Sequence, residues 1–203
     1  MPKVVDKEAK KLEILNAAIK VFAKNGMVKT KMAEIAQAAG IGKGTIYEYY
    51  RSKEEIFHEA FIQIYADMHE SVSKALKETD DPIEKIKLLI NTYLDKFDES
   101  EDFVEIMMDF WAEGVRNKNA DVLKIINLNQ IYTHHRNLIS EILEDGIRKG
   151  VFRQRNTKLT ASVLLGAFDG LFLQWIIDRS IFNLHEVADE LLDGFLNGIK
   201  KSA

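Results

Sequence analysis

The chain has 203 residues, of which 46% are hydrophobic and 30% charged, a composition typical of a globular protein rather than a disordered one. It contains no cysteine, which excludes a disulfide scaffold, a thiol nucleophile and a thiolate metal site. The first residues hold no apolar core for a secretion signal, and the most apolar stretch, residues 163–177, is interrupted by Asp169 and falls short of the roughly 18 residues that span a bilayer. We therefore expect a soluble cytoplasmic protein that does not enter a membrane.

Charge is distributed unevenly along the chain. Residues 1–53 carry eleven Lys and Arg against five Asp and Glu, whereas the remaining residues carry 17 against 27. A basic first quarter would suit a polyanion, although a lysine-rich solvated surface would give the same count. The two parts are thus expected to meet different partners.

The spacing of apolar residues predicts helices throughout. The only prolines are Pro2 and Pro82, and apolar residues recur with a helical period without sustained alternation. We predict an all-α fold of about nine helices. The expected ranges are 7–24, 32–39, 43–49, 52–78, 82–97, 101–116, 119–148, 156–178 and 184–199.

Local signals mark several helix ends. Asn25-Gly26 is expected to end the first helix with a left-handed cap, and Ser52 with Glu55 is a capping box for the fourth. Asp80-Asp81-Pro82 begins the next helix. The pattern divides the chain into a three-helix unit over residues 1–52 and a larger helical unit over residues 53–203.

Residues 30–55 read as a helix-turn-helix: a short helix, a glycine turn and a second short helix. Small or apolar residues on the first helix and Ile46 on the second are expected to face each other. The outward arc of the second helix, about 140° wide, would enter a major groove. It carries Lys43, Gly44, Tyr47 and Glu48.

The N-terminal part of the chain, which includes this stretch, closely resembles the TetR family of bacterial transcription regulators over about 45 residues. The matching positions are Gly26, Thr30, Ile35-Ala36, Ala39-Gly40-Ile41, Lys43-Gly44-Thr45-Ile46-Tyr47, Tyr49-Tyr50 and Ser52-Lys53-Glu54-Glu55. The resemblance implies a homodimer whose N-terminal domains bind a palindromic DNA operator and whose C-terminal domain binds an inducer.

Carried over by position, the resemblance also implies DNA-binding roles. Lys43 and Gly44 would lie nearest the base edges, and Thr45, Tyr47 and Tyr49 near phosphates. Lys53 would pair with a phosphate, Lys31 would offer a charge to phosphate, and Thr30 would help to present the amides of the following helix to the DNA backbone. Tyr50 is expected in the core.

Three positions depart from the family pattern. Lys31 and Gly42 replace frequent capping residues, so side-chain caps are lost there, although Lys31 gains a charge that favours phosphate. Glu48 either points to solvent or accepts a hydrogen bond from a cytosine amine.

Other chemistry is not expected. Residues 40–45 resemble a nucleotide-binding loop but fit no such motif, since Gly44 follows Lys43. His134 and His135 are adjacent and cannot clamp a metal as an i, i+4 pair does. With no nucleophile motif either, we expect no enzyme activity, no cofactor and no metal.

A small lipophilic effector is expected to bind in the larger unit, among residues that suit an apolar pocket but equally suit an ordinary core. The candidates are Phe61, Tyr65, Met68, Tyr93, Met107, Trp111, Phe168, Phe172 and Trp175. Glu105, Asp109 and Glu113 recur on one helix face. They form either a solvated acidic stripe or, facing inward, a site for a lipophilic cation.

The last two helices are unusually apolar, and Gly166 and Gly170 would permit close helix approach. In the resembled family these helices pair with their copies in a four-helix bundle. The sequence thus predicts a ligand-responsive, homodimeric DNA-binding regulator, most simply a repressor released from its operator by the effector. The alternative is a helical small-molecule-binding protein without specific DNA recognition.

Overall fold

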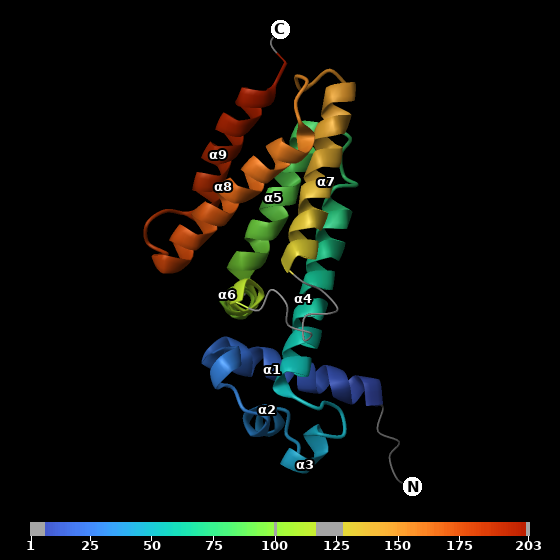
Figure 1. Ribbon diagram of the computed structural model, residues 1–203, viewed down its shortest axis with the longest axis vertical. Coiled ribbons are helices and arrows are strands. Elements are labelled where there is room, and N and C mark those ends of the chain that lie inside the picture. The colour runs from blue at the N-terminus through green and yellow to red at the C-terminus, as the bar shows by residue number, and fades with distance from the viewer. Residues whose placement is uncertain (1–6, 100, 117–127, 202–203) are drawn as a thin grey trace. The chain divides into compact units, whose positions relative to one another are not determined.

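The computed structural model describes residues 7–99, 101–116 and 128–201, and these ranges form nine α-helices and no strand (Figure 1). The helices are α1 (Lys7–Lys29), α2 (Met32–Ala38), α3 (Lys43–Ile46), α4 (Lys53–Ala75), α5 (Pro82–Glu99), α6 (Glu101–Arg116), α7 (Leu128–Arg148), α8 (Thr157–Ile177) and α9 (Leu184–Ile199). The predicted all-α fold is confirmed. The start of the seventh predicted helix, residues 119–127, lies outside the described residues.

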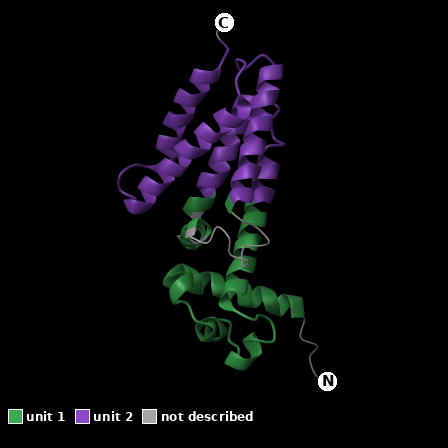
Figure 2. Cartoon of the chain, viewed as in Figure 1, with its two compact units in different colours: residues 1–68, 96–128 green, residues 69–95, 129–203 purple. Residues whose placement is uncertain are grey.

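The chain divides into two compact units (Figure 2). Unit 1 comprises residues 1–68 and 96–128, and unit 2 comprises residues 69–95 and 129–203. Helices α4 and α5 each contribute residues to both units. Unit 1 therefore joins the helix-turn-helix to α6, which follows it by more than 40 residues in the chain.

Unit 1 has a continuous apolar core. Ile14, Ala18 and Phe22 on α1 are buried together with Ile35 on α2 and Ile46 on α3. The ring of Phe22 meets Phe57 of α4 edge to face, with centroids 5.2 Å apart, an arrangement favoured by the quadrupoles of aromatic rings. Because all four helices bury residues there, the core holds α2 and α3 in place.

Helix α1 is broken at Gly26, where φ is +72° and ψ is 155°. Side chains disfavour this left-handed φ, which glycine adopts freely. The predicted stop at Asn25-Gly26 is confirmed as a break, but one further turn follows it, up to Lys29.

The start of α4 differs in one detail from the predicted capping box. The amide of Glu55 donates to Ser52 Oγ over 3.2 Å, as expected. The Glu55 carboxylate, however, accepts from the amide of Arg51 over 2.7 Å instead of from Ser52. The reciprocal half of the box is thus displaced by one residue.

In unit 2, the segment between α7 and α8 is tied to the end of α9. Gly150, with φ +74°, ends α7, and Phe152 forms an isolated antiparallel bridge with Lys200. The buried ring of Phe152 lies where a side chain on Gly146 would stand. A glycine is therefore required at position 146.

Helix α8 corrects one prediction. Among the described residues it is the one helix that by length and composition alone could cross a membrane, a criterion that core helices of soluble proteins also meet. Residues 163–177 alone are too short to span a bilayer, but the helix begins earlier, at Thr157, and carries just two charged residues, Lys158 and Asp169. Most of its apolar side chains are buried or half-buried, and the exposed ones are Leu159, Val163, Leu173 and Ile177.

Candidate nucleic-acid interface and effector-binding helices

The outward face of α3 and of the turn that follows it is open to solvent. Lys43, Gly44 and Glu48 are exposed, and the Tyr47 side chain is 50% exposed. Ile46 and Tyr50 on the opposite side are buried. One face of this short segment thus packs on α1 and α2 while the other is free to meet a partner.

Gly44 has no structural reason to be glycine. A Cβ built there meets no heavy atom within 4 Å, and its φ lies outside the left-handed region. Gly40 differs, because its φ of +65° makes the turn between α2 and α3. The missing side chain at Gly44 leaves the backbone open to a surface outside the chain.

Tyr50 is a core residue, as predicted. Its hydroxyl donates to Glu59 Oε2 over 2.7 Å, and the Lys11 ammonium lies 5.1 Å from its ring centroid. Burial, followed by the hydrogen bond to Glu59, raises the pKa of Tyr50 far above its usual value. Tyr49 and Thr45 are half-buried at the edge of the exposed face.

Two predicted DNA-binding residues make hydrogen bonds within the chain itself. Lys53 Nζ donates to the carbonyls of Met27 and Val28 over 2.9 and 2.7 Å. Thr30 is buried, and its hydroxyl donates to the carbonyl of Gly26 over 2.8 Å. Both side chains therefore stabilise the end of α1, and their contact with DNA stays a prediction.

The N-termini of α2 and α3 lack side-chain caps, as the sequence suggested. Lys31 is exposed, and its amide donates to Glu34 Oε2 over 2.8 Å. Gly42 precedes α3 in an extended conformation without a capping side chain. The start of α2 is thus capped by the Glu34 carboxylate in place of a side chain at position 31.

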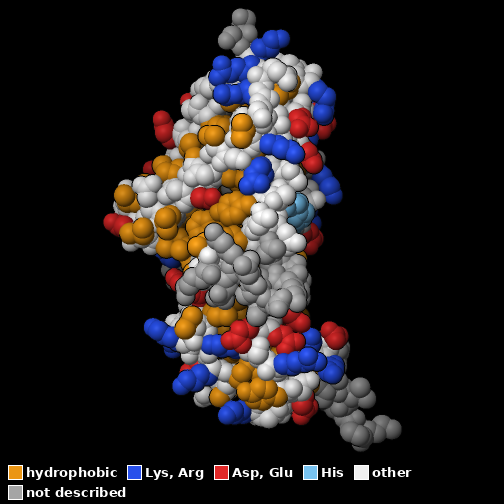
Figure 3. All heavy atoms as spheres, viewed as in Figure 1, with side chains coloured by type: hydrophobic (Ala, Val, Ile, Leu, Met, Phe, Trp, Pro, Cys, Tyr) orange, Lys and Arg blue, Asp and Glu red, His pale blue; other side chains and the backbone are white. Residues whose placement is uncertain are grey.

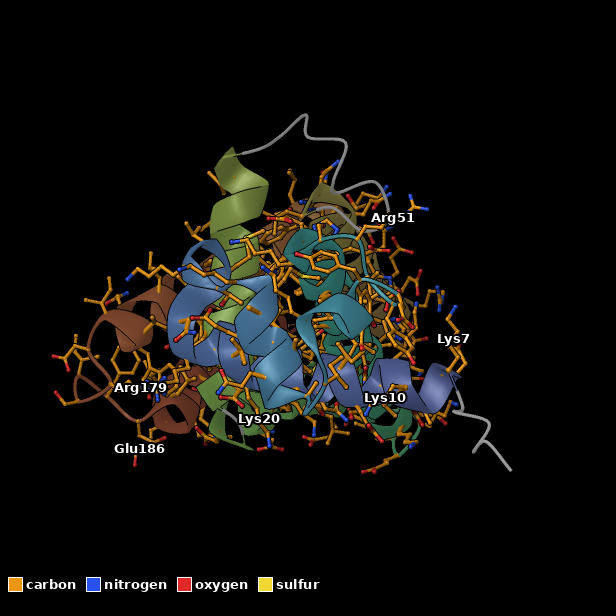
Figure 4. All side chains as sticks on the ribbon, turned by 90° about the horizontal axis from the view of Figure 1, so that it is seen from below. Lys7, Lys10, Lys20, Arg51, Arg179 and Glu186 are labelled. Carbon is orange, nitrogen blue, oxygen red and sulfur yellow. The ribbon has the colours of Figure 1, made fainter. Side chains whose placement is uncertain are left out.

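Lysine and arginine side chains surround this part of unit 1. Figure 4 labels Lys7, Lys10 and Lys20 along α1 and Arg51 in the turn before α4. Lys10 pairs with Glu13 over 2.6 Å, whereas Lys7, Lys20 and Arg51 are exposed. Their charges would attract a polyanion.

The effector candidates of unit 1 lie on α4 and α6. Phe61 is buried and stacks on Phe110, with ring centroids 3.6 Å apart, and on Tyr65 at 6.1 Å. Met68 is also buried. Burial raises the pKa of the Tyr65 hydroxyl. Met107, Trp111 and Tyr65 are half-buried.

The effector candidates of unit 2 lie on α5 and α8. Trp175 is buried and stacks on Phe172 at 6.0 Å, with the Arg179 guanidinium 4.9 Å from its ring. Phe168 and Phe172 are half-buried. Tyr93 is half-buried and forms a hydrogen bond to His135 Nε2 over 2.8 Å.

A polar layer around α7 was missed in the sequence. His134 Nε2 lies 2.7 Å from His69 Nε2, and Tyr132 donates to Asp169 Oδ2 over 2.8 Å. Burial and the neighbouring histidines lower the pKa of His135 to about 4, and burial raises that of Asp169. In the sequence, the adjacent His134 and His135 are the signal that points to this layer, but their spacing bears on metal binding and does not reveal their hydrogen-bond partners. Within the described ranges, no group of three or more candidate ligands is arranged to hold a metal ion.

Asp109 departs from both interpretations of the acidic residues on α6. Glu105 is exposed as expected, but Asp109 is half-buried and its Oδ2 accepts a hydrogen bond from the amide of Met27 over 2.5 Å. The Asp109 carboxylate is neither simply solvated nor placed for a bound cation, because its hydrogen-bond partner is a backbone amide of α1. The Glu113 side chain lies outside the described residues.

Two family models together cover most of the chain. The model of bacterial regulatory proteins of the tetR family matches residues 14–60, and that of the C-terminal region of YsiA-like proteins matches residues 61–198. The chain belongs to the TetR family. It is a ligand-responsive DNA-binding transcriptional regulator and not an enzyme, and the alternative without DNA recognition is not supported.

Relatives of this TetR-family chain match along nearly its whole length. The fatty acid metabolism regulator protein of Bacillus subtilis (strain 168) is 24% identical over 194 residues, covering 95% of this chain and 97% of the relative. The structure of a Clostridium perfringens protein described as a fatty acid metabolism regulator is 30% identical, with a TM-score of 0.70, and covers 94% of this chain and 100% of its own. The Bacillus subtilis FadR structure in complex with stearoyl-CoA is 24% identical, with a TM-score of 0.78, and covers 93% of this chain and 98% of its own.

Proposed function

We propose that the chain is a cytoplasmic homodimeric repressor that a long-chain acyl-CoA releases from a palindromic operator. In this proposal residues 1–52 form the DNA-binding domain and residues 53–203 the effector-binding and dimerisation domain. The observation that carries it is the two-sided segment formed by α3 and the turn after it, with Ile46 and Tyr50 buried and Lys43, Gly44 and Tyr47 exposed. A segment of this kind can enter a major groove while its other face is held rigidly.

The proposed DNA contacts follow from exposure and chemistry. Lys43 would donate to guanine acceptors, and Gly44 would let the backbone approach the groove floor. Tyr47, Tyr49 and Thr45 would donate to phosphates, as would Lys31. Thr30 and Lys53 would position the backbone near the DNA, because both hold the end of α1 next to α2.

The effector class is proposed from the relatives. Fatty acid metabolism names two of them, and stearoyl-CoA occupies one of the solved structures. The exposed or half-buried aromatic and Met side chains of each unit suit an acyl chain. The capture of Asp109 by α1 argues against a cationic effector at that residue.

Dimerisation is proposed through α8 and α9. Leu159, Val163, Leu173 and Ile177 are exposed along α8, where hydrophobic side chains gather on the surface in Figure 3. Gly166 and Gly170 on the same helix have open space at their Cβ positions. Such a face is energetically unfavourable in water and favourable against a copy of itself.

The DNA-binding proposal is tested by selecting genomic fragments with the protein and measuring their affinity at two salt concentrations. We expect saturable binding that weakens steeply with salt, because phosphate contacts release counterions. Lys43→Ala should weaken binding to the selected fragment by about tenfold and relax base preference, consistent with the loss of one base contact.

Lys53→Ala serves as the comparison. It should weaken selected and random DNA by similar factors, because it acts on the backbone or through the end of α1. Equal losses on selected and random DNA for Lys43→Ala would contradict the assignment of Lys43 as the base-reading residue.

A further inference from the structure

The break in α1 leaves one backbone amide without its helical acceptor. At Gly26, ψ of 155° rotates the next peptide plane away from the helix direction. The amide of Met27 therefore leaves the ladder of i to i−4 hydrogen bonds. A partly buried amide needs another acceptor, since leaving it without one is costly.

Helix α6 supplies that acceptor. Oδ2 of Asp109 lies 2.5 Å from the Met27 nitrogen, and a Cβ at Gly26 would stand 3.6 Å from the same oxygen. The contact joins residues 82 positions apart in the chain. A charged acceptor makes a stronger hydrogen bond than a neutral one.

The captured segment leads directly into the helix-turn-helix. Only Val28, Lys29, Thr30 and Lys31 separate Met27 from Met32, the first residue of α2. The carbonyls of Met27 and Val28 are held by Lys53 at the start of α4, and that of Gly26 by Thr30. Three side chains thus hold this short segment by hydrogen bonds, and of these three Asp109 on α6 lies outside residues 1–60.

The next residue on α6 makes a second contact. Phe110 is buried and stacks face to face on Phe61 of α4. Two consecutive residues of α6 therefore contact two helices of unit 1, Asp109 on α1 and Phe110 on α4. A shift of α6 would act on the entrance to α2 through a hydrogen bond to backbone and on α4 through ring packing.

We infer that Asp109 is a positioning residue for DNA recognition, because its hydrogen bond to Met27 sets the path of the chain from α1 into α2. The carboxylate does not touch DNA in this proposal. It determines where α2, and with it α3, lies relative to α6. The inference extends the proposed function but is testable without DNA and without an effector.

The test uses the full chain labelled with ¹⁵N-methionine. Only six methionines are present, so few amide signals appear, and Met27 and Met32 report on both ends of the connecting segment. Met68 on α4 serves as an internal reference. The variants are Asp109→Ala, Asp109→Asn, which keeps a side-chain oxygen, and Glu105→Ala, an exposed control one turn earlier on α6.

In the wild-type chain we expect a Met27 amide that exchanges with solvent at least about a hundredfold more slowly than a free amide. Asp109→Ala should accelerate this exchange by about tenfold and shift the Met27 and Met32 signals, as the loss of one buried hydrogen bond requires. Asp109→Asn should restore most of the protection, and Glu105→Ala should leave the Met27, Met32 and Met68 signals in place.

Affinity for a genomic duplex selected by the wild-type protein provides the functional readout. Asp109→Ala should weaken binding by about tenfold and Asp109→Asn by less than about threefold, each measured below the unfolding temperature. Affinity of Asp109→Ala within about twofold of wild type would overturn the inference.

Two outcomes separate the inference from the proposed function. If Asp109→Ala does not fold, the wild-type chain and Asp109→Asn decide. A wild-type Met27 amide that exchanges as fast as a free amide overturns the inference. A wild-type Met27 amide that is protected, together with shifted Met27 and Met32 signals in Asp109→Asn, supports it. If the wild-type chain selects no duplex, the repressor proposal fails, and the Met27 and Met32 signals alone decide the role of Asp109.

Discussion

At Gly44, a substitution should affect DNA binding without harming folding. Its backbone is ordinary and nothing fills the space of its Cβ. Gly44→Ala should therefore leave the free energy of unfolding unchanged or raise it by up to about 1 kcal/mol, the usual helix-propensity gain. It should weaken binding to a selected duplex by about tenfold, because the added methyl keeps the backbone from the groove.

Urea unfolding and fluorescence anisotropy measure the two effects separately. Gly40→Ala is the contrasting variant, because φ at Gly40 is +65° and an alanine there is strained. It should lower stability. Unaltered DNA affinity for Gly44→Ala would show that α3 does not approach DNA as proposed.

His135 makes stability depend on pH. Burial, with the nearby His134 and His69, lowers its pKa to about 4 in the folded chain, against about 6.5 unfolded. The neutral form is favoured in the fold, so its stabilisation is complete above pH 6.5 and is lost as pH falls toward 4. Between pH 7.5 and 5 we expect a loss of about 2 kcal/mol from this group.

The variant that isolates this effect is His135→Gln, which can still bond Tyr93 but does not titrate. Its loss between pH 7.5 and 5 should be smaller than that of wild type by about 2 kcal/mol in urea unfolding. Other groups, including His134 and Asp169, are common to both proteins and cancel in the comparison. Equal losses in the two would place the titration elsewhere.

Residues whose roles depend on local spacing were predictable, and those whose partners are distant were not. The helix-turn-helix pattern placed Ile46 in the core and the family resemblance placed Tyr50 there, and both are buried. Asp109 and Lys53 read as a surface acid and a phosphate ligand, yet each bonds the backbone at the end of α1. Nothing in their own neighbourhood in the sequence encodes that contact.

At the scale of elements, apolar period and breaker residues predicted the helices well. Their ends were less predictable, because hydrogen bonding continues past weak stops. Helix α1 resumes for one turn after Gly26, and α3 ends at Ile46, three residues earlier than expected, where turns replace it. Period alone also did not show which side of α8 is exposed.

The exposed face of α8 makes a prediction about assembly. Val163 on this face is 66% exposed, and Val115 on α6 is comparably exposed at 61%. A buried glutamate in a dimer interface is costly, whereas one on a free surface is not. Val163→Glu should therefore shift the chain toward monomer in analytical ultracentrifugation, and Val115→Glu should not.

Both variants need the same secondary structure by circular dichroism as the wild type for this comparison. A wild-type chain that is monomeric at micromolar concentration, or a Val163→Glu chain that remains fully dimeric, would remove α8 from the proposed interface.

For the whole molecule, the distribution of charge and the contacts within unit 1 both fit a DNA-binding regulator. The basic first quarter presents α3, while α6 from the acidic remainder bonds the segment that leads into α2. An effector that favours one arrangement of the helical body could change DNA affinity only by as much as its affinity differs between the two arrangements.

Native mass spectrometry of the protein with a selected genomic duplex tests the central claim most directly. The account predicts a complex of one duplex with an even number of chains, two per palindromic site, and release of free duplex when stearoyl-CoA is added. A complex with a single chain per duplex, or no complex with any genomic fragment, would contradict it. A complex that persists in stearoyl-CoA would contradict the proposed effector.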